Sequence, residues 1–148
     1  MRSLWDPDAT DHILARLDRL TPDTRARWGR FNCSDMVAHL NEWFRMALGE
    51  ISPASKQVPI RFFPLKQLII YVLPFPKGVP TAPELIARSG RAVWSDEVRS
   101  FRELLGRVVA CSAETRWPTH PAFGSMTRRS WGVLGYRHLS HHFTQFGV

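Results

Sequence analysis

Hydrophobic residues recur at helical spacing in four separate segments of this 148-residue chain. In the first segment they stand three or four residues apart, which places them on one face of a helix. We expect this helix to run for about a dozen residues, from the capping sequence Asp6-Pro7-Asp8 to Thr21-Pro22. Its apolar positions are Ile13, Leu14, Leu17 and Leu20.

The second segment predicts a helix that ends near Leu48, with Gly49 as a natural stop. Asn32 or Ser34 is expected to cap its start. His39 lies on the flank of the apolar arc, so we expect its side chain to point inward. The apolar face consists of Cys33, Met36, Val37, Leu40, Trp43, Phe44 and Ala47. The residues expected to face solvent are Asn41, Glu42 and Arg45.

The third helix is expected to begin at Ser95-Asp96-Glu97, a sequence typical of helix starts. Its apolar line consists of Val98, Phe101, Leu105 and Val108. The fourth helix is expected to span roughly Thr127 to Gln145. Its apolar arc contains Trp131, Leu134, Gly135, Leu139, Phe143 and Phe146. The opposite side is expected to carry Val133, Arg137, Ser140 and Thr144.

A long segment rich in proline separates the second helix from the third, from Gly49 to about Trp94. Within it, only Leu65 to Leu73 has a helical pattern. Connections between neighbouring antiparallel helices usually have only a few residues, so this length favours a crossover between two parallel helices. With no alternating strand pattern and no repeat, residues 1–148 are predicted to form one all-α domain, a four-helix bundle with a long crossover.

Charge and targeting signals narrow the function classes. The net charge is +7, but the basic residues are scattered and form no continuous stripe, so nucleic-acid binding is not favoured.

The N-terminus lacks the apolar core of a signal peptide. The longest apolar run, Leu65 to Phe75, is too short to span a bilayer. Cys33 and Cys111 match no disulfide or zinc pattern and are expected to be buried core residues, which favours a cytoplasmic protein without membrane association.

Two histidines four residues apart, His138 and His142, lie in the middle of the apolar arc of the last helix. Buried imidazoles are costly unless their nitrogens are satisfied, and a shared metal ion satisfies both. An inward-pointing His39 on a second helix completes a three-nitrogen site. Three protein ligands leave a coordination position open, which is typical of catalytic metal sites. Imidazole ligands suit zinc, nickel, copper or ferrous iron.

Other interpretations of the histidines remain open at this stage. His138 and His142 are also compatible with ordinary histidines at the edge of a core, hydrogen-bonded to backbone or solvent. His141 or His120 can replace a member of the triad. His12, beside Asp11 at the start of the first helix, is expected to be exposed to solvent.

Several segments resemble the DinB-like superfamily of four-helix-bundle metalloproteins, and specifically its uncharacterised DUF1569 branch. They cover most of the chain in the right order: residues 28–49, residues 73–84, His120-Pro121-Ala122-Phe123-Gly124, Trp131-Gly132 and residues 136–148. The superfamily pattern has one histidine in the second helix and an H-x-x-x-H in the fourth. The resemblance therefore implies that His39, His138 and His142 are metal ligands in a bundle with a long crossover.

The resemblance also implies a class of activity. Better-known relatives are metal-dependent thiol transferases and isomerases that use bacillithiol, mycothiol or glutathione. We therefore expect a divalent metal ion (zinc, nickel or iron) and a small-molecule substrate or thiol, handled by a transferase or hydrolase. Arginines near the site are expected to hold a carboxylate, while Asp35 and Glu42 are weaker candidates for a general base. Related bundles often pair through helix faces, so the resemblance is also compatible with a homodimer.

The alternative is a non-catalytic module that binds a ligand or partner and whose metal is structural or incidental. In that case the interaction surface is expected to include exposed Trp5 and Trp117 and the crossover around Ile60 to Pro80.

Overall fold

The computed structural model describes residues 1–54, 58–75, 77, 92–111 and 114–148, and within these ranges it is all-helical. Five α-helices and one 3₁₀ turn occur there, and no strand. They are α1 (Ala9–Leu17), α2 (Cys33–Ala47), η1 (Pro59–Arg61), α3 (Leu65–Tyr71), α5 (Trp94–Val109) and α6 (Arg128–Gln145). The predicted all-α class is confirmed. None of the described helices is long and apolar enough to cross a membrane.

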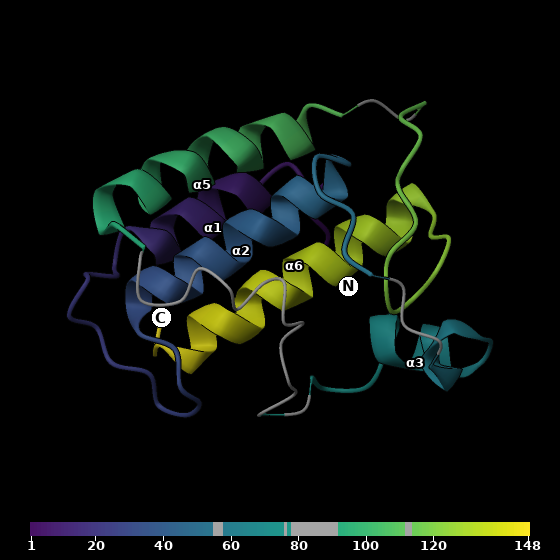
Figure 1. The fold of residues 1–148 in the computed structure, drawn as a ribbon, viewed down its shortest axis with the longest axis horizontal. Coiled ribbons are helices and arrows are strands. Elements are labelled where there is room, and N and C mark those ends of the chain that lie inside the picture. Colours follow the sequence, from purple (N-terminus) through teal and green to yellow (C-terminus); the bar gives the residue numbers. More distant parts are fainter. Residues whose placement is uncertain (55–57, 76, 78–91, 112–113) are drawn as a thin grey trace.

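The helices α1, α2, α5 and α6 lie side by side, and α3 stands apart from them next to α6 (Figure 1). Helices α2 and α5 run in the same direction. Asn41, in the middle of α2, donates a hydrogen bond to the carbonyl oxygen of Glu97 at the start of α5, at 2.9 Å. Glu50, just beyond α2, pairs with Arg107 near the end of α5. This parallel arrangement agrees with the crossover expected from the sequence, of which residues 55–57, 76 and 78–91 lie outside the described part.

The main core fills the space between the four long helices. Its largest fully buried members include Phe44, Phe101, Trp131 and Phe143. A second, smaller apolar cluster joins α3 to α6 and consists of Ile70, Phe123, Val133 and Leu134. Since each face of α6 meets one of these clusters, every residue from Ser130 to Tyr136 is buried.

Side-chain caps begin two of the helices, and the cap at Asn32 was predicted. The Asn32 side chain accepts a hydrogen bond from the Asp35 backbone N–H at 2.8 Å, and the Thr127 hydroxyl accepts one from the Ser130 N–H at 3.1 Å. Each cap satisfies a backbone donor that the first turn of a helix leaves unpaired. Gly49, at φ +76°, follows the end of α2. The first helix is shorter than predicted, with nine residues, and Asp8 forms no side-chain cap.

Three residues outside the predicted apolar faces of α2 and α6 are buried, which contradicts the expected exposure of Asn41 and Glu42. Asn41 and Glu42 are buried because α5 packs against their side of α2; the Asn41 amide is satisfied there by Glu97, and Glu42 pairs with Arg45 at 2.7 Å. Val133 is buried because α3 covers its side of α6.

Cysteine and tryptophan placement also differs in part from prediction. Cys33 is buried, and burial raises the pKa of its thiol to about 11. Cys111 is only half-buried, because it lies beyond the end of α5. Trp5 and Trp117 are half-buried rather than exposed, since their rings pack against each other at 5.4 Å.

Candidate metal centre

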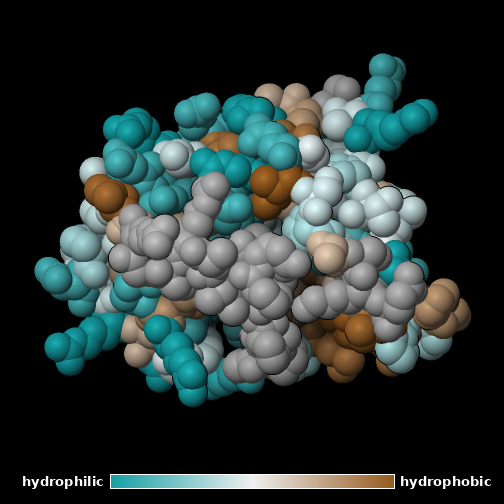
Figure 2. Space-filling view, in the orientation of Figure 1, coloured by the Kyte–Doolittle hydropathy of each residue, from teal (hydrophilic) through white to brown (hydrophobic). Residues whose placement is uncertain are grey.

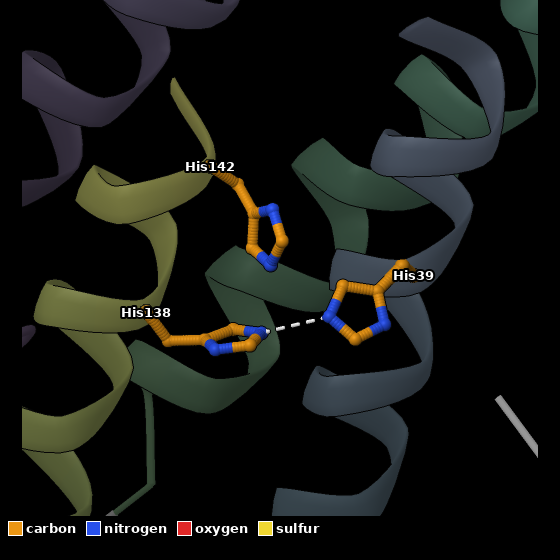
Figure 3. A group of neighbouring side chains, drawn as sticks. All are labelled: His39, His138 and His142. Carbon is orange, nitrogen blue, oxygen red and sulfur yellow. Dashed lines mark hydrogen bonds between the residues drawn. The ribbon is translucent and has the colours of Figure 1, made fainter. Parts of the chain in front are cut away.

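His39 of α2 and His138 and His142 of α6 lie together between the two helices (Figure 3). The three rings have centroid separations of 4.8 to 5.1 Å. Each residue offers a ring nitrogen, and these nitrogens all lie within 4.8 Å of one another. The closest pair, His39 Nε2 and His138 Nε2, is 3.1 Å apart. The three histidines are therefore near enough to hold a single metal ion.

A glycine in α6 allows the two helices to approach this closely. A Cβ atom at Gly135 would lie 2.4 Å from the ring of Trp43 on α2 and 2.6 Å from Leu4. Both distances are well inside van der Waals contact, so any other residue would force α6 away from α2. Gly135 stands one turn before His138, and it therefore helps to set the separation between His138 and His39.

Aromatic side chains enclose the histidines on several sides. Phe31 stacks on His39 at 5.3 Å, Trp43 stacks on His138 at 6.0 Å, and Phe75 lies 6.5 Å from His138. His39 and His142 are buried, whereas His138 is half-buried. The cluster thus has apolar walls, and His138 is its most exposed member.

Burial keeps the three imidazoles neutral. It lowers the pKa of His39 to about 3 and that of His142 to about 4, and repulsion from neighbouring histidines adds to the effect. Burial holds the pKa of His138 well below its ordinary value, and repulsion from neighbouring histidines, chiefly His142 and His39, adds to this effect. Neutral imidazole is the form that binds metal ions, so the site needs no deprotonation at pH 7.

Hydrogen bonds determine which nitrogen of His142 carries its proton. The Gln145 amide nitrogen donates to the carbonyl oxygen of Trp28 at 2.7 Å, and a carbonyl oxygen can only accept. The amide oxygen of Gln145 must therefore be the atom 2.8 Å from His142 Nδ1, and it accepts the Nδ1 proton. His142 Nε2 is left with a free lone pair, and it points toward the space between His39 and His138 (Figure 3).

Gly29 leaves room for the Gln145 amide to reach the Trp28 carbonyl oxygen. Its φ of +84° is accessible chiefly to glycine, and a Cβ atom there would lie 2.4 Å from the Gln145 amide nitrogen. Our sequence interpretation did not identify Gln145 as part of the site. Its position three residues after His142, on the same side of the helix, was the available signal.

The closest pair of nitrogens has a spacing that suits a divalent transition-metal ion. Two nitrogens bound to one tetrahedral zinc ion at about 2.0–2.1 Å stand about 3.3 Å apart, close to the 3.1 Å between His39 Nε2 and His138 Nε2. Without an ion, one proton must bridge these two nitrogens. His39 Nδ1 is buried and has no hydrogen-bond partner among the described residues, so no contact at Nδ1 fixes the tautomer of His39.

The other histidines lie outside the triad. The ring nitrogen Nδ1 of His120 accepts hydrogen bonds from the backbone N–H groups of Ala122 and Phe123, at 3.1 and 3.2 Å, and so holds the loop before α6. His141 is half-buried, with its ring 5.3 Å from that of His142. His12 is exposed, as expected, and its Nδ1 lies 2.8 Å from the Tyr136 hydroxyl.

A surface pocket of about 360 Å³ adjoins the cluster at His141 and Phe75. Arg137 lines it, but its guanidinium donates to the carbonyl oxygens of Ile69 and Ile70 near the end of α3. The other cation of the pocket is Lys77, whose Nζ lies 4.5 Å above the ring of Trp28.

The two carboxylates considered as general bases both have partners on or next to α2. Asp35 accepts a hydrogen bond from the Asn32 side chain at 2.8 Å, and Glu42 pairs with Arg45. These contacts hold both carboxylates near their own helix.

Comparison with known proteins yields no significant match to a protein-family model, a curated protein or a solved structure. The family of the chain therefore stays a prediction from its sequence.

Proposed function

We propose that His39, His138 and His142 bind one divalent metal ion, and that the chain is a metalloprotein with the four-helix bundle of the DinB-like superfamily. The observation that carries this proposal is the convergence of three neutral ring nitrogens from two helices within 4.8 Å. The resemblance of residues 28–49 and 136–148 to that superfamily supports it independently. Zinc, nickel and iron are among the metals that suit an imidazole donor set.

We further propose that the protein is a transferase or hydrolase acting on a small molecule, with a low-molecular-weight thiol as a candidate cosubstrate. A divalent ion held by three imidazoles supplies Lewis acidity at its open position, which lowers the pKa of a coordinated water or thiol. The chain contributes the enclosure of the site. Phe31, Trp43 and Phe75 surround the site with apolar rings that exclude water from its walls.

Two further groups have roles in this scheme. Gln145 holds His142 in the tautomer that presents Nε2 to the site. Lys77, in the adjoining pocket, provides a positive charge for an anionic group such as the carboxylate of a thiol cosubstrate. Arg137 is less suited to this role because its donors are occupied by the carbonyl groups near the end of α3.

Elemental analysis of untagged protein tests the proposal. We expect near-stoichiometric zinc, nickel or iron in the wild type, and loss of that metal in His138→Ala with little loss of helix content. His141→Ala is the matched control, because it removes a neighbouring imidazole outside the triad and should retain the metal. Protein that takes up no metal even after reconstitution would overturn the proposal.

Activity is tested separately by supplying thiols and electrophilic small molecules to the metal-loaded protein. We expect turnover that is lost on chelation and restored by the metal. Stoichiometric metal whose removal lowers thermal stability but changes no substrate consumption would contradict the enzymatic part and leave a metal with a structural role.

A further inference from the structure

Large apolar side chains are exposed together around α3. The α3 patch, as we name it, consists of Phe62 (68% exposed), Phe63 (81%), Leu65 (42%), Leu68 (38%), Val72 (67%) and Leu73 (45%). Only two other large apolar residues in the described part of the chain, Met1 and Val93, are exposed. An apolar surface gathered in this way typically marks an interaction site.

The patch is held on a fixed element. Ile70, on the inner side of α3, is buried against Val133 and Leu134 of α6. The guanidinium of Arg137 ties the end of α3 to α6 through backbone carbonyl groups. Helix α3 nevertheless projects beyond the long helices (Figure 1), and hydrophobic residues gather in the surface over it (Figure 2). Its outer face is thus presented outward rather than folded into the core.

The segment of chain that carries the patch has charges of one sign only, although Asp6 from the N-terminal segment lines a pocket together with Tyr71, Val72 and Arg129. Residues 51–83 contain four basic residues, Lys56, Arg61, Lys66 and Lys77, and no aspartate or glutamate. Lys66 lies within α3 and is anchored by donating to the Ser125 carbonyl oxygen. Arg129, exposed on the neighbouring turn of α6, has its guanidinium carbon 5.9 Å from the centre of the Tyr71 ring. Cations therefore border an apolar surface that carries two adjacent phenylalanines.

We propose that the α3 patch docks the protein onto a membrane surface that contains anionic phospholipids. Phe62 and Phe63 enter the interfacial region, while Arg129 lies near the headgroups. Surface association of this kind combines buried apolar area with attraction to anionic lipid and requires no membrane-spanning helix. A second copy of the chain is a less suitable occupant, because it would bring two basic faces of molecules with net charge +7 against each other.

Cosedimentation of the 148-residue chain with vesicles tests this inference, and the test does not depend on the metal. One set of vesicles contains phosphatidylcholine alone, and the other contains phosphatidylcholine with phosphatidylserine. We expect binding to the second set that weakens as sodium chloride is raised. The double variant Phe62→Ser/Phe63→Ser should lower the partition coefficient about tenfold or more, whereas Val93→Ser, which alters an exposed apolar residue elsewhere, should leave it unchanged.

Three outcomes would overturn the inference. The first is no binding to phosphatidylserine vesicles. The second is binding that the double variant leaves intact. The third is a wild-type dimer, seen by light scattering in solution, that the same variant converts to a monomer without any vesicle binding; the patch would then be an interface between copies of the chain.

Discussion

Replacing Gln145 with leucine tests whether the orientation of His142 matters for metal binding. Leucine has a similar size but removes the acceptor for His142 Nδ1–H and the donor to the Trp28 carbonyl. Either nitrogen of His142 can then carry the proton. Loss of a group that orients a metal-ligating histidine typically lowers metal affinity about 10- to 100-fold, or about 1.4–2.7 kcal/mol. We expect a decrease in this range for Gln145→Leu.

Two measurements separate orientation from simple destabilisation. The zinc dissociation constant is obtained by competition with a chromogenic chelator, and ¹⁵N NMR of the metal-free protein reports the tautomer of His142. We expect the wild type to show the Nδ1–H form and Gln145→Leu to show a mixture. The leucine variant should also be less stable by about 1–3 kcal/mol, because the Trp28 carbonyl loses its partner.

Gln145→Glu is the matched control. Its carboxylate still accepts from His142 Nδ1–H but cannot donate to Trp28, so the variant should lose stability while keeping at least wild-type metal affinity. Equal loss of affinity in the glutamate and leucine variants would refute the reasoning. So would wild-type affinity in Gln145→Leu.

Two further predictions concern packing and pH. Gly135→Ala would place a methyl group 2.4 Å from Trp43 and 2.6 Å from Leu4, so urea unfolding should show a loss of about 1–3 kcal/mol together with weaker metal binding. Gly106→Ala, in open space on α5, should instead gain about 0.5–1 kcal/mol, and similar effects at both sites would contradict the role of close packing. Burial and the nearby Lys66 lower the pKa of His120 to about 4, from 6.5 in an unfolded chain. As the pH falls from 6.5 to 4, the unfolded state therefore binds the proton first, and His120 alone should reduce the free energy of unfolding by about 3 kcal/mol. Denaturant titrations at each pH should show that the free energy of unfolding of His120→Gln decreases less between pH 6.5 and 4 than that of the wild type. If both proteins lose free energy of unfolding equally over this range, His120 has an ordinary pKa in the folded protein.

Much of the local structure could be predicted from the sequence because it depends on neighbouring residues. Asn32 and Thr127 cap their helices through the backbone N–H three residues ahead. The spacing of His138 and His142 places them one turn apart on any helix. That geometry, together with an inward His39, sufficed to select the three histidines that the structure brings together.

What lies against each helix was decided only by the tertiary structure. Periodicity gives the angle of a side chain around its own helix axis but does not say which element covers that angle. Asn41 and Val133 have angles typical of a solvent-facing side, yet α5 and α3 bury them. The same holds for Gln145, whose role depends on the distant Trp28 carbonyl. These contacts join residues far apart in the chain, so they exist only when the helices have packed.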